Sequence, residues 1–268
     1  MFKLVASMVI YNNSFEEIER VIKEYYSENI EQKLIVIDNT NTGYLKEKIF
    51  ALEPDVDYIL SENVGYGTAN NIAIKKYAEN SKYFLIINPD IFVSLENIKK
   101  LIKYADTKDN FGIIMPKILS ESNEIQYLCK LLPTPLNLFS RRFLFKLSYF
   151  NKLNYDYELR FLDYNSEFVV PVLSGCFMFC LSENLIREKG FDEEFFMYLE
   201  DVDLSRRMYK YNNYYYPEIE VYHIHKKESF KSLKMTIEHI KSGIKYFNKW
   251  KWFLDEERKE INNCILKK

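Results

Sequence analysis

The sequence predicts an α/β protein whose central sheet is mainly parallel and covered by helices on both faces. Two observations support this. Short apolar runs alternate with amphipathic segments through residues 1–115, and the runs are continuous, as in strands buried on both faces. The length of 268 residues allows one large domain, or one domain with a short appendage.

The composition is that of a soluble globular protein and excludes two classes. Hydrophobic residues make up 47% of the chain and charged residues 28%. The net charge of -2 gives no general attraction to nucleic acid, so we expect no nucleic-acid partner. No apolar run approaches the roughly 18–20 residues needed to span a bilayer. The first ten residues lack a cleavage site and predict a strand, so we expect a cytoplasmic protein.

The first half of the chain is predicted to alternate strands and helices. Leu4–Tyr11 is the first apolar run, and Ser14 with Glu17 forms a capping box that starts a helix. Further strands are predicted at Leu34–Ile37, Tyr58–Leu60 and Tyr83–Ile87, with helices after residue 67 and after Ser94.

Polar residues stand at the ends of four of these strands. Ligands of such sheets bind outside the carboxyl ends of the strands, so this edge is the predicted binding site. The residues concerned are Asn12, Asp38, Asn63 and Asp90.

The second half is less regular. Residues 117–169 predict a variable insertion near the acceptor, and a strand is expected at Val170–Leu181. Glu200 opens a helix, a strand carrying histidines follows, and one long helix ends the chain.

Two motifs suit phosphate or metal chemistry. Gly65 and Gly67 lie between a strand and a helix start, where bare backbone N–H groups favour anions, although a tight turn explains them equally well. Asp90, in Asn88-Pro89-Asp90, offers a carboxylate to a hard divalent ion, or else simply caps a turn.

Two further motifs suit acid–base or ligand chemistry. Glu200, Asp201 and Asp203 crowd one helix start, where repulsion and the apolar run at 195–199 can raise a carboxyl pKa toward that of a general base. The alternative is favourable placement in the helix dipole. His223 and His225 alternate on a strand and so share a face.

Taken in order, these segments resemble the family 2 glycosyltransferases, and most closely their bacterial rhamnosyltransferase-like branch. The resemblance covers about residues 3–250. Its most specific motifs are Asn88-Pro89-Asp90 and Glu200-Asp201-Val202-Asp203. It implies a GT-A fold, a nucleoside-diphosphate sugar donor, Mg²⁺ or Mn²⁺, and inverting transfer of a sugar to a glycan or lipid-linked acceptor in surface polysaccharide synthesis. Rhamnose is the sugar that this branch suggests.

The resemblance also implies roles for individual residues. Asp201 would be the catalytic base, with Gly175 and Glu200 on the acceptor side. Asp90 would bind the metal, with His223 or His225 nearby. Asp38 would contact the nucleotide base and Arg207 a phosphate, and the full set predicted for the donor is Tyr11, Asp38, Asn63, Gly65, Gly67, Asn70, Asn88 and Arg207.

The resemblance divides the chain into a glycosyltransferase domain and an extension. Residues 1–225 form the domain, with a nucleotide-sugar-binding half at 1–115 and an acceptor-binding half at 116–225. Two other classes stay open: a sugar-nucleotide nucleotidyltransferase and a non-catalytic nucleotide-sugar-binding protein. The first would need a Gly-rich basic loop after the first strand, where this chain has Tyr11-Asn12-Asn13-Ser14. Intact Asp90 and Asp201 argue against the second.

The extension at 226–268 is predicted to be an amphipathic basic helix. Its apolar seam packs on the domain, lies on the inner face of an anionic membrane, or forms a homodimer through residues 229–254. The seam consists of Phe230, Leu233, Ile237, Ile240, Ile244 and Phe247, continued by Leu254.

Overall fold

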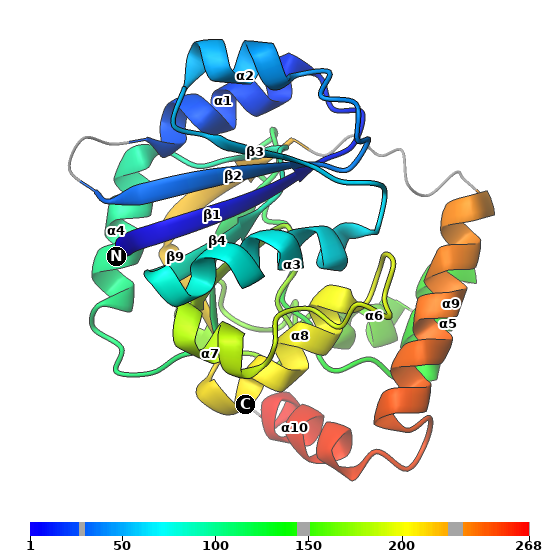
Figure 1. Ribbon diagram of the computed structural model, residues 1–268. Coiled ribbons are helices and arrows are strands. Elements are labelled where there is room, and N and C mark those ends of the chain that lie inside the picture. Colours follow the sequence, from blue (N-terminus) through cyan, green and yellow to red (C-terminus); the bar gives the residue numbers. More distant parts are fainter. Residues whose placement is uncertain (27–29, 144–150, 225–232, 268) are drawn as a thin grey trace.

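The computed structural model describes residues 1–26, 30–143, 151–224 and 233–267. Its centre is a nine-stranded sheet in the order β3-β2-β1-β4-β8-β6-β9-β5, with β7 paired to β9 (Figure 1). Within these residues no helix is both long and apolar enough to cross a membrane.

The first half of the sheet is parallel, as predicted. Strand β1 pairs in parallel with β2 and β4, and β2 pairs in parallel with β3. The central residues of β1, β2 and β4 are fully buried, as their continuous apolar runs predict. The bounds are β1 Phe2–Ile10, β2 Gln32–Asp38, β3 Asp57–Leu60 and β4 Ser81–Ile87.

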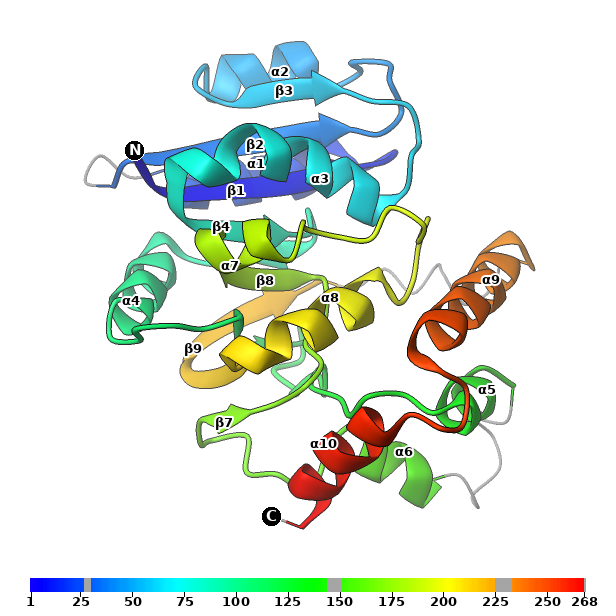
Figure 2. The same cartoon turned by 60° about the horizontal axis from the view of Figure 1, so that its bottom comes forward.

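Helices cover both faces of this half (Figure 2). The predicted capping box at Ser14 is present, and the Ser94 side chain accepts a hydrogen bond from the Asn97 N–H at 3.2 Å. Helices α1 and α4 cover one face and α3 covers the other. The bounds are α1 Phe15–Tyr25, α2 Lys46–Leu52, α3 Tyr66–Tyr77 and α4 Leu95–Ala105, with a 3-10 turn at Ala78–Asn80.

The second half of the sheet mixes directions. Strand β8 is antiparallel to both β4 and β6, whereas β6 and β9 are parallel. The bounds are β5 Ile91–Phe92, β6 Ile113–Leu119, β7 Phe168–Val169, β8 Phe177–Leu181 and β9 Tyr214–His223. The helices here are α5 Pro135–Phe143, α6 Asn151–Tyr157, α7 Ser182–Arg187 and α8 Glu200–Met208, with a 3-10 turn at Tyr209–Tyr211.

The strand predicted at Val170–Leu181 is shorter than expected, because β8 begins only at Phe177. Part of the backbone before it bonds to helix α8. The Leu173 N–H donates to the Ser205 hydroxyl at 3.2 Å, and that hydroxyl donates to the Leu173 carbonyl at 3.1 Å. This segment is therefore tied to the helix that carries Asp201.

The prediction of one long terminal helix is wrong. The extension forms α9 (Leu233–Trp250) and α10 (Glu256–Leu266). Lys251 adopts a left-handed backbone with φ of +67°, which ends α9, and the Asp255 carboxylate caps α10 by accepting from the Arg258 N–H at 3.0 Å.

The apolar seam of α9 is only partly packed. Phe247 is buried and shares an apolar cluster with Tyr246, Phe195 and Leu199, so the extension is joined to the 116–225 half. In both views α9 lies beside α5. Phe230 falls outside the described residues, and the seam residues that stay exposed are Leu233, Ile237, Ile240, Ile244 and Leu254.

Candidate active site

The glycine turn after β3 packs directly on the loop that precedes α8. Gly65 has φ of +90°, and any side chain there would collide with the Phe196 carbonyl. A Cβ on Gly67 would lie 3.4 Å from the Cβ of Glu200. The Tyr66 hydroxyl donates to the Gly175 carbonyl at 2.7 Å. The turn therefore needs glycine to bring the donor-side edge against the acidic motif.

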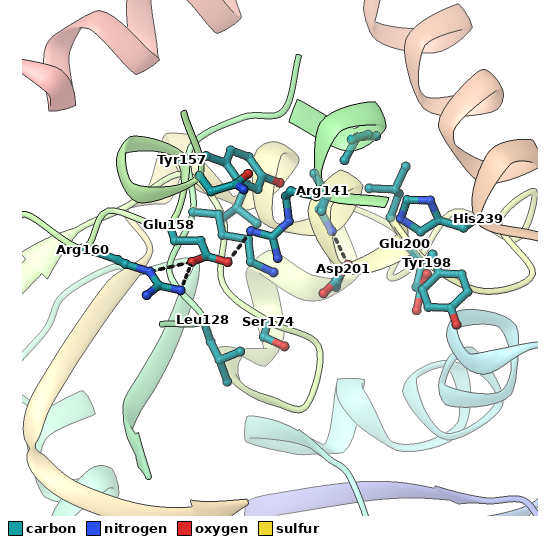
Figure 3. Close-up of a pocket in the computed structure, with 16 residues that line it drawn as sticks. Leu128, Arg141, Tyr157, Glu158, Arg160, Ser174, Tyr198, Glu200, Asp201 and His239 are labelled. Carbon is teal, nitrogen blue, oxygen red and sulfur yellow. Dashed lines mark hydrogen bonds and ion pairs between the residues drawn. The ribbon is translucent and has the colours of Figure 1, made fainter. Parts of the chain in front are cut away.

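Asp201 is held in one orientation at the start of α8. One carboxylate oxygen accepts from the Gly175 N–H at 2.9 Å and the other from the Val202 N–H at 2.8 Å. A Cβ on Gly175 would lie 3.0 Å from that of Asp201, so only glycine permits this approach without a shift. Asp201 faces a cavity of about 410 Å³ (Figure 3).

Glu200 has a different environment from its neighbour. Its side chain is buried, and its Oε2 atom has no hydrogen-bond partner within the described part of the chain. Burial and the nearby Asp201 raise the pKa of Glu200 to about 8. Glu200 is therefore mostly protonated at neutral pH, which leaves Asp201 as the carboxylate available to accept a proton.

Asp90 and His223 meet across the sheet edge. The His223 Nε2 atom lies 3.2 Å from the Asp90 Oδ2 atom. The Gln126 amide donates from Nε2 to the His223 carbonyl at 3.2 Å, which turns its oxygen toward the His223 Nδ1 atom at 3.0 Å. Since an oxygen only accepts, Nδ1 must carry a proton there. In a neutral ring, Nε2 then directs a lone pair at a carboxylate oxygen.

Two acceptors face one another in this way only if a proton or a cation lies between them. The Asp90 Oδ1 atom is also buried without a hydrogen-bond partner in the described chain. Both features fit a divalent cation held by Asp90 and His223. The ranges that the structure describes contain no group of three or more His, Cys, Asp or Glu side chains that could hold a metal ion. Further ligands would therefore have to come from elsewhere, as donor phosphates can.

The two carboxylates belong to one region. The Asn88 N–H donates to the Cys176 carbonyl at 2.9 Å, and the preceding residue, Gly175, donates to Asp201. Burial raises the pKa of Cys176 to about 12, and the charges of Asp90 and Asp201 both contribute. Residues far apart in the sequence thus converge beside the glycine turn.

A second hollow lies at the ends of β1, β2 and β3, on the side predicted for the nucleotide. The Asn39 amide donates to the Asn63 side-chain oxygen at 3.3 Å across it. The predicted donor residues Tyr11 and Asn63 both line this hollow, and its other lining residues are Asn12, Asn39, Thr40, Asn41 and Glu62.

Two residues of the predicted donor set, Asp38 and Asn70, are buried in the fold. Asp38 is fully buried and accepts four hydrogen bonds, two from Thr40, one from the Gly43 N–H and one from the Tyr58 hydroxyl. Asn70 is also fully buried, accepting from Ser7 and donating to the Tyr66 carbonyl. The two side chains shape the loops beside the hollow rather than line it.

Arg207, predicted to contact a phosphate, has several partners within the protein. Its guanidinium donates to Asp203 at 2.9 Å, to the Gly190 carbonyl at 2.8 Å and to the Glu188 carbonyl. Arg207 lies six positions after Asp201 on a helix, so the two side chains point to different sides. His225 falls outside the described residues.

Sequence reasoning missed one wall of the Asp201 cavity. The residues of this wall lie in the segment 117–169, which the sequence predicted to be a variable insertion. They include Lys130, Arg141, Tyr157, Glu158 and Arg160. The basic, aromatic character of 139–150 was the only available signal, and Lys130 and Gln126 had none.

The chain belongs to the family 2 glycosyltransferases, because the model of that family matches residues 7–182. It is therefore a glycosyltransferase, as the motif resemblance indicated. It is also similar to the rhamnosyltransferase WbbL of Escherichia coli (strain K12), with 27% identity over 253 residues that cover 91% of this chain and 92% of that protein.

Solved structures share the GT-A fold at low sequence identity. GalNAc-T7 with UDP, GalNAc and Mn²⁺ has a TM-score of 0.63 at 14% identity over 90% of this chain, which spans 47% of that longer chain. TarS 1-349 of S. aureus with UDP-GlcNAc has a TM-score of 0.60 at 13% identity, over 98% of this chain and 70% of that one. PcManGT of Pyrobaculum calidifontis, a mannosyltransferase solved with GDP-Man and Mn²⁺, has a TM-score of 0.58 at 14% identity. The match covers 91% of this chain and 64% of that one.

Proposed function

We propose that this glycosyltransferase moves a sugar from a nucleoside-diphosphate sugar to a hydroxyl of a glycan or lipid-linked acceptor in surface polysaccharide synthesis, with inversion and with Mg²⁺ or Mn²⁺. Rhamnose is the proposed sugar, because the relative WbbL is a rhamnosyltransferase. The observation that carries the proposal is the Asp201 carboxylate, fixed by the Gly175 N–H at the cavity beside the glycine turn.

Asp201 is the proposed base. The acceptor hydroxyl donates a hydrogen bond to the carboxylate, and its proton passes to Asp201 as its oxygen attacks the anomeric carbon. The nucleoside diphosphate leaves from the opposite face, so a single displacement inverts that carbon. Glu200, held protonated by burial, leaves the base role to its neighbour.

Asp90 and His223 are the proposed metal ligands, with Gln126 fixing the imidazole. A divalent cation bound there supplies charge neutralisation for the departing diphosphate. GalNAc-T7 and PcManGT were solved with Mn²⁺ and a nucleotide or nucleotide sugar, which supports this part of the proposal.

The decisive test is Asp201→Asn. Asparagine keeps the shape of the side chain but cannot take a proton at neutral pH, so we expect transfer to fall by roughly 10²–10⁴-fold. Donor affinity should stay within about threefold of wild type, because the change leaves the glycine turn and Asp90 intact. Sugar transfer is followed by chromatography and donor binding by calorimetry, over dTDP-, UDP- and GDP-sugars with Mn²⁺.

Asp163→Asn is the matched control, since that carboxylate lies in an exposed turn where it accepts from Ser166 at 2.7 Å. Its transfer rate should match that of wild type. Undiminished transfer by Asp201→Asn would remove the assignment of the base.

A further inference from the structure

The cavity beside Asp201 has one strongly basic wall. Lys130, Arg141 and Arg160 all line it, and Figure 3 shows the two arginines. They come from three separate segments: an isolated bridge between Lys130 and Val172, helix α5, and the turn after α6. A volume of about 410 Å³ is enough for a sugar with a neighbouring charged group.

Glu158 accounts for part of this positive charge. It lies between the two arginines in Figure 3 and pairs with both, with 2.7 Å between Arg160 Nε and Glu158 Oε2. The arginines also lie over aromatic rings, Arg141 at 5.2 Å from the centre of Tyr157 and Arg160 at 4.9 Å from that of Tyr127. One carboxylate thus orients two guanidinium groups and neutralises the charge of only one.

The Lys130 side chain has no such partner among the described residues. Its backbone N–H donates to the Val172 carbonyl at 3.0 Å, which fixes the start of the side chain in the wall. Its ammonium makes no hydrogen bond or ion pair with any residue in the described ranges. Burial, and then the charge of Arg141, lower the pKa of Lys130. A partly buried, unpaired cation destabilises a fold and is expected where a ligand supplies the anion.

The acidic side chains of the cavity do not neutralise all of the positive charge of the basic wall. Three basic groups face Glu158, Asp201 and Glu200, and Glu200 is held mostly protonated at neutral pH. The cavity therefore has excess positive charge before an acceptor enters. This excess grows when Asp201 takes the acceptor proton, so an anion close to the reacting hydroxyl is stabilised most during transfer.

We propose that the acceptor carries a phosphate or diphosphate close to the hydroxyl that is glycosylated, and that Lys130, Arg141 and Arg160 bind it. This inference rests on the proposed function, since it names the class of acceptor for the same site. Guanidinium forks match phosphate oxygens in pairs, and the lysine adds a point charge. The phosphate belongs either to a soluble phosphorylated glycan or to a lipid carrier.

The test compares two probes that differ only in the phosphate, glucose 1-phosphate and glucose, by calorimetry on the full chain. EDTA is present, so that the Asp90–His223 pair cannot bind phosphate through a metal. We expect wild type to bind glucose 1-phosphate at least about tenfold more tightly than glucose. Lys130→Met should remove most of that preference, and Lys130→Arg should retain it to within about threefold.

Two further variants keep the test interpretable. Arg160→Gln, at a side chain that is 46% exposed, should also reduce the preference, and it serves if Lys130→Met fails to fold. Lys117→Met is the control, because that lysine is 14% exposed, pairs with Glu220 at 3.2 Å and does not line this cavity. Its preference should equal that of wild type.

Vesicles distinguish the two sources of phosphate. Displacement of glucose 1-phosphate by phosphatidylcholine vesicles containing polyprenyl phosphate, and not by phosphatidylcholine alone, identifies a lipid carrier. Displacement by neither identifies a soluble phosphorylated glycan. Equal binding of glucose and glucose 1-phosphate by wild type, or an unchanged preference in both Lys130→Met and Arg160→Gln, would overturn the proposal. This binding measurement needs neither a donor nor sugar transfer. A negative result would therefore refute the phosphate site and leave the proposed glycosyl transfer, which the Asp201→Asn assay tests, untouched.

Discussion

At the scale of single residues, two neighbouring carboxyl groups in the first turn of α8, those of Glu200 and Asp201, have different surroundings. Asp201 receives two backbone N–H groups, which favour a negative charge. Glu200 is buried beside that charge and has an unpartnered oxygen. The two residues face different sides of the helix start. Their carboxyl groups are nearly identical chemically, and their different surroundings give them different protonation behaviour.

Glu200→Gln is expected to stabilise the protein increasingly as pH rises. The folded-state pKa of Glu200 is raised from 4.5 to about 8, so its contribution to stability is present below pH 4.5 and lost as pH rises through about 8. Glutamine does not titrate. The free energy of unfolding of the variant relative to wild type should therefore increase by about 2 kcal/mol between about pH 6 and about pH 8.5.

Urea denaturation at the two pH values measures this difference. Glu193→Gln is the control, because burial is not the main influence on that carboxyl, whose pKa is lowered mainly by Lys75. A stability difference that stays constant between the two pH values would contradict the assignment of a protonated Glu200.

A second prediction at this scale concerns Asp90. If Asp90 and His223 hold the cation, Asp90→Ala should weaken nucleotide binding by at least about tenfold in Mn²⁺ and leave weak binding in EDTA unchanged. Calorimetry with UDP, GDP and dTDP, each with Mn²⁺ or with EDTA, provides the measurement. Equal affinity of wild type with and without Mn²⁺ would count against the metal site.

At the scale of elements, helix α8 joins the active site to the C-terminal extension. Its first turn carries Asp201, and its buried Arg206 forms two 2.7 Å bonds with Asp255 at the start of α10. The Trp250 ring, at the end of α9, lies 4.1 Å from the Arg206 guanidinium and donates to Asp203 at 2.8 Å. The extension therefore holds α8 through Arg206 and Asp203, and its own His239 lines the cavity beside Asp201.

Arg206→Met is expected to lower the free energy of unfolding by about 3–5 kcal/mol, because the buried Asp255 carboxylate loses both of its 2.7 Å bonds to a cation. It keeps the Arg258 N–H at 3.0 Å, and the Arg258 guanidinium lies at 3.8 Å. The double variant Arg206→Met/Asp255→Asn should recover part of that loss, since asparagine is uncharged and still caps α10. Urea denaturation measures both. Equal stability of Arg206→Met and wild type would contradict a structural role for this pair.

At the scale of the whole molecule, the sheet brings together at one edge residues that the sequence keeps apart. The parallel half places the nucleotide-side hollow at the ends of β1–β3. The reversal at β8 then brings Gly175 and Cys176 between the Asp90 and Asp201 regions. The site therefore lies where the parallel order ends, as expected for ligands of open α/β sheets.

The sequence alone determined the features that local pattern controls. Continuous apolar runs specify buried parallel strands, and capping residues specify where α1 and α4 begin, because both depend on residues close together in the chain. The glycine turn and the acidic motif were recognisable for the same reason. The family followed from the order of these motifs.

Only the tertiary structure decided which polar groups are exposed and which meet. Asp38, Asn70 and Arg207 matched the family pattern, and in the structure each is bonded to other parts of the protein. Gln126 and Lys130 showed no local signal, and they reach the site through contacts with strand β9 and with Val172. Burial and long-range pairing arise from the packing of distant segments, and spacing along a chain does not encode them.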